Sequence, residues 1–273
     1  MAKPKLCKSF YLIAFLLILS ACSSQPIYDG GPTTGASNVP VPADDAIPRD
    51  EPRSRYGNGP YYKVNGSTYE VMGTNYGYSE RGVASWYGKK FHGQLTSNQE
   101  RYNMYSMTAA HKSLPLPSYV RVRNLKNGKS VVVRVNDRGP FVDNRLIDLS
   151  YAAAVKLDMI TAGTSLVEVT AINFDESPAP QPAEPVVVDE QAAEAVEYIF
   201  VQVGAFGEPE NARRRFSLLR DVGIDRAFVY EDRNTSPALY RVRIGPIADV
   251  LQYDSIVEQL QRIGISETHL VTE

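Results

Sequence analysis

The sequence predicts a two-domain protein, in which a mostly β domain is followed by a smaller α+β domain. Short β-branched runs separated by Gly, Asn and Pro fill residues 61–172, as expected for one compact β domain. Residues 196–273 follow the order strand, helix, strand, strand, helix, strand. Two stretches, 22–60 and 173–195, are rich in Pro, Gly, Ser or Ala and cannot bury a core, so we expect a flexible tether and a linker. A length of 273 residues suits two domains.

Residues 1–21 have the pattern of a secretory signal peptide. Lysines precede an apolar run at residues 10–19, which is too short to span a bilayer. Small residues stand directly before Cys22, and this arrangement resembles the bacterial lipobox. The resemblance implies cleavage before Cys22, attachment of lipid to its thiol and, since Ser23 follows, sorting to the outer membrane. The alternative is an ordinary signal peptide with an incidental cysteine.

Cysteine and charge content exclude several classes of function. Cys7 leaves with the signal peptide and Cys22 carries lipid, so the mature domains have no thiol for disulfides, catalysis or metal binding. The formal net charge is -2, which offers no basic surface for nucleic acid. The three histidines lack ligand spacing. We therefore expect no metal, no cofactor and no nucleic-acid partner.

Two local patterns fix elements of the first domain. The Asn127-Gly128 pair lies between the β-branched runs 119–123 and 130–135, and Asn-Gly tolerates the positive φ of a hairpin turn. Ser150 is a good N-cap, and the helix-favouring run 151–157 follows it.

Five motifs occur in order along the first domain. They are GVASWYG at 82–88, FHG at 91–93, TAAHK at 108–112, VNDRGPF at 135–141 and IDLS at 147–150. Together they resemble the rare lipoprotein A family, and the resemblance covers essentially the whole chain. It implies a six-stranded double-psi β-barrel of the barwin and expansin type, and lytic transglycosylase activity on peptidoglycan. Gln99 stands where the family usually has Gly, which alters the permitted turn before Glu100.

The family's catalytic acid and its partners fall, residue by residue, on Asp137, Glu100 and His111. A lytic transglycosylase closes the muramic 6-hydroxyl onto C1 without water, so one carboxyl with a raised pKa can serve first as acid and then as base. Asp137 follows a strand directly, where a side chain can project from the turn. Asp148 is a rival, because the similar expansins keep an aspartate at a comparable Asp-Leu-Ser motif.

Each candidate also has a purely structural explanation. Asp137 could cap a turn or pair with Arg138, Glu100 could be a solvated loop charge, and His111 could bridge loops. Asp148 could favour the dipole of the helix after Ser150. Aromatic residues surround these motifs, and flat rings suit the apolar faces of pyranoses, although such rings are also common in barrel cores. They are Trp86, Tyr87, Phe91, Tyr102, Tyr105 and Phe141.

In the second domain, strand alternation predicts one open, polar sheet face. Along 198–206 and 239–244, it sends the aliphatic residues toward the helices. The residues expected on the open face, as a platform for a glycan, are Gln202, Phe206, Arg241 and Arg243.

The motifs VQVGAF at 201–206 and YRVRIGP at 240–246 resemble the SPOR domain. The resemblance implies binding of peptide-stripped peptidoglycan and enrichment at the division septum. The alternative is that the arginines only solubilise the sheet. An RNA-binding domain of the same topology is disfavoured by the acidic charge and the export signal.

Two functions follow from these patterns. The first is a lytic transglycosylase that a SPOR domain localises; the second is a non-catalytic septal protein whose barrel only grips glycan. Both have peptidoglycan strands as partner, the membrane through lipid on Cys22, and division proteins as further candidates. The polar constellation in the first domain favours the enzyme.

Overall fold

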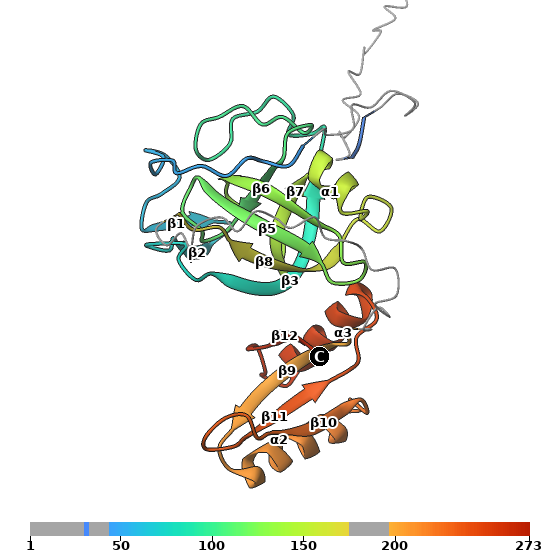
Figure 1. Cartoon of the computed structure of the whole chain (residues 1–273). Helices are drawn as coiled ribbons and strands as arrows, with labels where there is room; N and C mark the ends of the chain where they lie inside the picture. Colours follow the sequence, from blue (N-terminus) through green and yellow to red (C-terminus); the bar gives the residue numbers. More distant parts are fainter. Residues whose placement is uncertain (1–29, 33–43, 175–196) are drawn as a thin grey trace, which may run out of the picture.

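The computed structural model describes residues 30–32, 44–174 and 197–273, which form a barrel and a second, smaller domain (Figure 1). The expected signal peptide and Cys22 lie outside these residues. Within the described ranges, no helix has both the length and the apolar character needed to cross a bilayer.

The first domain is a closed barrel of six strands in the order β3-β7-β4-β6-β5-β8. Its strands are β3 (Ser79–Tyr87), β4 (Thr108–His111), β5 (Ser118–Asn124), β6 (Ser130–Asp137), β7 (Arg145–Ser150) and β8 (Ser165–Ala171). Two neighbouring pairs, β3 with β7 and β4 with β6, are parallel, and the other pairs are antiparallel. Valines and leucines of alternate positions fill the interior, among them Val133, Val135 and Leu149, which are fully buried. The six-stranded barrel that the resemblance implies is confirmed.

Both local patterns of the first domain form as the sequence predicts. β5 and β6 pair as a hairpin, and Gly128 in its turn has φ 70°. The short helix α1 (Tyr151–Lys156) begins after Ser150, whose hydroxyl accepts a hydrogen bond from the Ala153 amide at 3.2 Å. The cap satisfies one of the free amides at the helix start.

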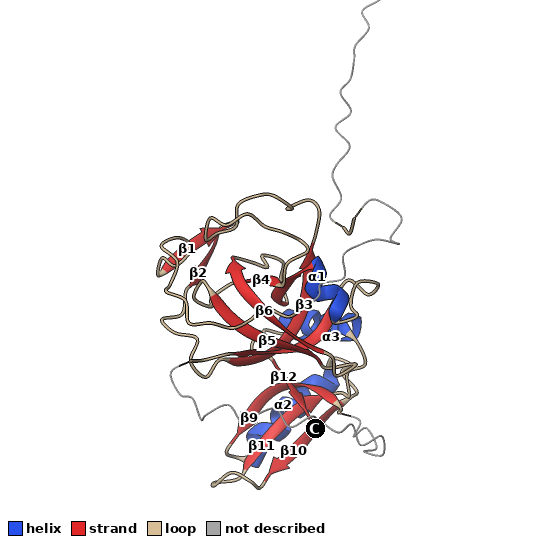
Figure 2. Ribbon diagram, turned by 45° about the horizontal axis from the view of Figure 1, so that its top comes forward, coloured by secondary structure: helices blue, strands red, loops and turns tan. Residues whose placement is uncertain are grey.

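A small hairpin outside the barrel was not specified by the sequence patterns. It consists of β1 (Tyr61–Val64) and β2 (Ser67–Glu70), joined by Asn65 and Gly66 with φ 50° and 85°. Positive φ at both central residues is the geometry of a tight two-residue turn. The hairpin lies beside the barrel, near the carboxyl end of β6 (Figures 1 and 2).

Residues 44–60, which the sequence predicts as part of the tether, lie against the barrel. The Ala46 amide donates to Val132 O at 3.0 Å, and the Ser54 amide donates to Leu116 O at 2.8 Å. Glu51 pairs with Arg134 at 2.8 Å. Composition alone suggested a solvated chain here, but the polar groups of residues 44–60 have fixed partners on the barrel surface, so these residues pack with the first domain.

The second domain has a four-stranded sheet in the order β10-β11-β9-β12, with both helices packed on one face. Its elements are β9 (Ile199–Phe206), α2 (Pro209–Asp221), β10 (Ala227–Asp232), β11 (Leu239–Ile244), α3 (Val250–Arg262) and β12 (His269–Thr272). Val201, Val242 and Ile244 of the sheet share one buried cluster with Leu219 of α2 and Leu260 of α3. The predicted α+β order is confirmed.

Polar and apolar contacts join the two domains. Arg145 of β7 pairs with Asp254 of α3 at 3.2 Å, and Arg123 of β5 pairs with Glu197 at 2.8 Å. Three barrel residues also join the apolar cluster of the second domain: Val83, Leu125 and Leu166.

Candidate active site and glycan-binding face

A β-bulge places the predicted acid on the outer surface of the barrel. In the β4–β6 pair, Ala109 is opposite Val135 but Ala110 is opposite Asp137, so Asn136 is the extra residue. A bulge resets the alternation of side chains by one position. Val135 therefore fills the core, whereas Asp137 shares the outer face of the sheet with Ala110.

One oxygen of Asp137 is held firmly. Oδ1 accepts hydrogen bonds from the Ser97 amide at 2.7 Å, the Ser97 hydroxyl at 2.6 Å and the Arg138 amide at 2.8 Å. Three donors fix the direction of the carboxyl group, and they leave Oδ2 as the oxygen available to carry a proton or meet a ligand. Ser97 was missed in the sequence, because an isolated loop serine carries no pattern.

Asp148 lies on the same face, on the other side of Ala110. Ala110 of β4 is opposite Asp137 on one neighbouring strand and Asp148 on the other. Two strand spacings put the backbones of the two acids about 10 Å apart. The Ser85 hydroxyl donates to Asp148 Oδ1. The chain therefore offers two carboxylates flanking a small side chain.

Two buried tyrosines lie close to the two acids. Tyr87 and Tyr102 stack with ring centroids 4.2 Å apart, and both are buried with Ala110 in a small apolar cluster. Burial raises the pKa of Tyr87 well above its usual value, and the nearby Tyr102, Asp137 and Asp148 raise it further. This tyrosine stays a neutral phenol at any working pH, so it contributes shape rather than charge.

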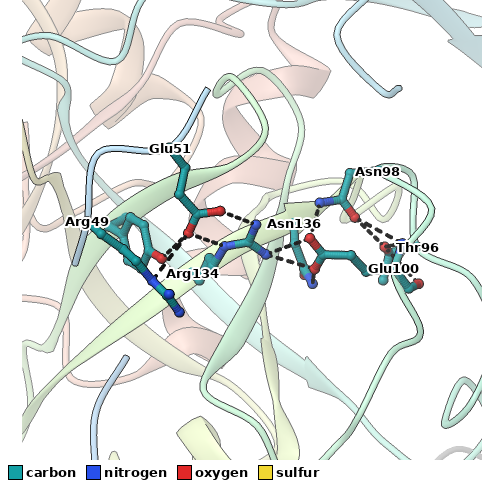
Figure 3. A network of polar contacts seen from close by, with 8 residues as sticks. Arg49, Glu51, Thr96, Asn98, Glu100, Arg134 and Asn136 are labelled. Carbon is teal, nitrogen blue, oxygen red and sulfur yellow. Dashed lines mark hydrogen bonds and ion pairs between the residues drawn. The ribbon is translucent and has the colours of Figure 1, made fainter. Parts of the chain in front are cut away.

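Glu100 is engaged in a separate ion-pair network (Figure 3). Both of its carboxylate oxygens accept from Arg134, at 2.7 and 2.9 Å, and Asn136 and Asn98 donate to it at 2.8 and 2.9 Å. Arg134 also pairs with Glu51 of the N-terminal segment at 2.8 Å. Glu100 is therefore an ion-paired, partly exposed carboxylate, and its role in catalysis stays a prediction.

The electrostatics of Glu100 favour its ionised form. Partial burial raises the pKa of this carboxyl, but the hydrogen bonds from Arg134, Asn136 and Asn98 and the charge of Arg134 outweigh burial and lower it overall. A permanently ionised group cannot supply a proton at neutral pH. Glu100 instead holds the loop at residues 96–101, which contains the Ser97 that orients Asp137.

Gln99 adopts the backbone conformation that its glycine counterpart would adopt. Its φ is 70°, and its amide donates to Thr96 O at 2.9 Å. Left-handed backbone costs a non-glycine residue of order 1 kcal/mol. The turn is therefore kept in spite of the substitution, and Glu100 reaches Arg134.

His111 does not join Asp137, and here the predicted catalytic role is not supported. Its side chain is only 2% exposed. Nδ1 accepts from the Ser113 and Leu114 amides at 3.2 and 3.1 Å, and Nε2 lies 2.9 Å from the Tyr78 hydroxyl. Since Nδ1 accepts, the proton must be on Nε2 and points at Tyr78. His111 follows Ala110 in β4, so alternation turns it away from the two acids.

Arg138 fastens the loop after Asp137 to the N-terminal segment. Its guanidinium donates to Gly57 O at 2.7 Å and to Leu114 O at 2.5 Å, and it lies over the ring of Tyr62 at 5.7 Å. Burial lowers the pKa of Arg138 to about 10, so it is still charged at neutral pH. One alternative explanation of Asp137 was an ion pair with Arg138, but the Arg138 guanidinium does not pair with this carboxylate.

The open face of the second domain carries three of the four expected residues. Arg243 donates to Gln202 at 3.3 Å and pairs with Glu273. Arg241 pairs with Asp232 at 2.8 Å. Their binding of glycan stays a prediction, but the arginines are fixed by partners rather than loosely solvated.

Phe206 is not on that face, and its assignment was wrong. The β9–β11 pairing shifts between Val242 and Arg243, which leaves Val203 as an extra residue in β9. Beyond this bulge, Phe206 packs against the helix-side core, with the Arg215 guanidinium of α2 at 5.8 Å from its ring. Strict alternation fails here because a bulge moves every later side chain to the opposite face.

Aromatic residues outside the predicted set of binding residues occupy the open face instead. Tyr230 lies under the Arg243 guanidinium at 4.6 Å, and Phe200 and Phe228 meet edge to face at 5.5 Å. The alternation of Phe228 and Tyr230 within β10 was the available signal.

The barrel with its acids and the sheet with its arginines define a class of protein: a double-psi barrel enzyme domain joined to a SPOR domain. The family model described as "Lytic transglycolase" matches residues 79–169, and that of the SPOR domain matches residues 195–269.

Relatives then define the family. The chain is 41% identical over 271 residues to the endolytic peptidoglycan transglycosylase RlpA of Vibrio cholerae, covering 96% of each chain. It is 37% identical to RlpA of Pseudomonas aeruginosa strain UCBPP-PA14, covering 91% of this chain and 85% of that one. A crystal structure of the RlpA SPOR domain from Pseudomonas aeruginosa matches 27% of this chain and 96% of that one, with 26% identity and a TM-score of 0.25. The chain belongs to the RlpA family of endolytic peptidoglycan transglycosylases.

Replacing Glu100 with Gln will lower stability in a pH-dependent way. The pKa of Glu100 is lowered from 4.5 in the fold, so its contribution is present above pH 4.5 and is lost as pH falls through the folded value. We expect Glu100→Gln to reduce the free energy of unfolding at pH 7 by about 1 kcal/mol, because the carboxylate is partly solvated. Urea unfolding at pH 7 and pH 3.5 measures this, with exposed Glu70→Gln as control. If the variant and the unaltered protein differed in free energy of unfolding by the same amount at both pH values, the ion pair would be contradicted.

The ring of His111 will remain neutral far below the usual histidine range. Burial, together with the charges of Arg138 and Lys112, lowers the pKa of His111 to about 3. Nitrogen NMR should show the Nε2–H tautomer of His111 unchanged from pH 8 to pH 4.5. Because the unfolded ring takes a proton below pH 6.5, His111 also makes the fold less stable as pH falls. A His111 midpoint near 6.5 would reopen a catalytic role.

Proposed function

We propose that this protein is a lytic transglycosylase that cleaves MurNAc-GlcNAc bonds of peptidoglycan and leaves 1,6-anhydromuramyl ends. The observation that carries the proposal is the position of Asp137: one oxygen is locked by three donors, the other is available, and a second carboxylate lies across Ala110. Membership of a family whose characterised relatives are named endolytic peptidoglycan transglycosylases supports it.

The geometry suits a single acid that acts twice. Asp137 Oδ2 gives its proton to O4 of the leaving GlcNAc as the bond from C1 to O4 breaks. The muramic O6 then bonds to C1, and its proton passes to Asp137, which restores the acid. Positive charge develops on the muramic ring between these steps, and Asp148 is placed to stabilise it electrostatically. Rigid donors from Ser97 and Arg138 keep Oδ2 aimed throughout.

The second domain and the N-terminus determine where the enzyme acts. We propose that the SPOR sheet face, with Gln202, Arg241 and Arg243, binds peptide-stripped glycan and enriches the enzyme at the division septum. Lipid on Cys22 anchors the chain in the outer membrane, facing the periplasm.

The products of purified glycan strands test the enzymatic proposal. Mass spectrometry after incubation should show 1,6-anhydromuramyl ends with the unaltered protein, and Asp137→Asn should lower their rate of formation at least a hundredfold, as loss of an acid catalyst does. Asp158→Asn, at an exposed aspartate paired with Lys129, is the matched control and should keep full activity. Strands that stay intact at high enzyme concentration would show that the barrel only grips glycan, and hydrated reducing ends would show a hydrolase.

Localisation tests the role of the SPOR face. A fluorescent fusion carrying Gln202→Ala and Arg241→Ala should lose most of its septal enrichment, because the glycan loses two polar contacts on the open face. Arg213→Ala, at an exposed arginine of α2, is the control and should localise normally. Circular dichroism establishes that the double variant is folded. Undisturbed enrichment of the folded double variant would contradict the assignment of this face.

A further inference from the structure

Three aromatic rings gather beside the two acids, and two of them belong to a hairpin outside the family's barrel match. Tyr62 of β1 and Tyr69 of β2 stack with centroids 5.2 Å apart, and Phe141 lies 5.5 Å from Tyr69 and 6.2 Å from Tyr62. The hairpin at residues 61–70 precedes the matched region, which begins at residue 79. We call these three residues the aromatic platform.

The platform is held rigidly. Tyr62 and Tyr69 are directly opposite in the hairpin register. The Tyr62 hydroxyl donates to Lys112 O at 2.8 Å, and the Arg138 guanidinium lies 5.7 Å from the centre of its ring. Arg138 is the neighbour of Asp137, so the same residue supports the acid loop and the platform.

The platform adjoins the acids directly. A Cβ atom built on Gly139 would lie 4.0 Å from the Phe141 ring, 3.9 Å from Asp148 Oδ2 and 3.7 Å from the Ala110 side chain. One point thus touches the platform, the second carboxylate and the residue between the two acids. Gly139 has φ 140°, which a residue with a side chain rarely adopts, so glycine is favoured at this point.

The rings are only partly buried, unlike the core of the barrel. Tyr62, Tyr69 and Phe141 are all of intermediate exposure, whereas Tyr87 and Tyr102 beneath the acids are buried. A cluster that served packing alone would be expected to close over its rings. Aromatic faces that stay partly open next to an acid pair suit the apolar faces of pyranose rings.

We propose that the aromatic platform is a glycan subsite, which stacks against a sugar of the strand beyond the bond that is cut. This inference rests on the proposed function and adds a consequence to it. A strand that reaches the platform gains binding that a shorter strand lacks, so the enzyme prefers long strands. Tyr69 and Phe141 offer the contact, and Tyr62 supports them from the side of Arg138.

Kinetics on peptide-free glycan strands of graded length test the subsite. Tyr69→Leu and Phe141→Leu keep apolar bulk but remove the flat ring. We expect each to raise KM for long strands about fivefold, the size of one lost aromatic contact, with kcat within twofold. KM for the shortest cleaved strand should not change, so the preference for length disappears in the double variant. Tyr61→Leu, on the opposite side of the hairpin and 62% exposed, is the matched control.

The outcomes separate this inference from the proposed function. If the unaltered protein yields no anhydromuramyl ends, the proposed function fails. If it is active and the leucine variants keep the length preference of the unaltered protein, the subsite fails alone. A uniform loss of activity at every strand length would show that the rings only support the hairpin, and this outcome also overturns the subsite. Melting temperatures of the variants identify any unfolding.

Discussion

The extra residue at Asn136 determines the chemistry of the barrel. Strand β6 must fill the core with Val133 and Val135, yet it must also present an acid outside two residues later. Regular alternation would send residue 137 inward, where a carboxylate is costly to bury. The bulge allows both requirements to be met. The consecutive residues Asn136 and Asp137 then reach different partners: Asn136 bonds to Glu100, and Asp137 bonds to Ser97.

Two arginines on either side of the bulge connect it to distant parts of the chain. Arg134 joins Glu100 of the loop at residues 96–101 to Glu51, and Arg138 joins the loop after Asp137 to Gly57. Both contacts involve residues 44–60, so a segment that precedes the barrel strands in the sequence completes the surroundings of the site. Guanidinium groups suit this role because their planar donors satisfy several acceptors at once. An aligned carboxyl needs such support to act repeatedly without reorganisation.

The sequence predicted the second domain closely: the order of its strands and helices is confirmed, and β11 occupies residues 239–244, the run to which alternation was applied. It also identified Asp137 and Asp148 as the competing acids, and the structure brings both to one face. It failed at Phe206 because the bulge at Val203 leaves no signature in an alternating run. His111 was overvalued for a similar reason, since a motif shows which residues recur together but not which way a ring turns.

By itself, the sequence predicted an export signal and mature domains without thiols, and it determined the two domain types and the kinds of residue available for glycan chemistry. These properties depend on composition, on local periodicity and on motifs that are contiguous in the chain. Tertiary structure alone decided that Ser97 aims Asp137, that Glu100 is bound to Arg134 and that Tyr69 lies beside Phe141. Each of these contacts joins residues that are 34 to 72 positions apart in the sequence. Barrel closure and bulges, which act over the whole sheet, bring them together.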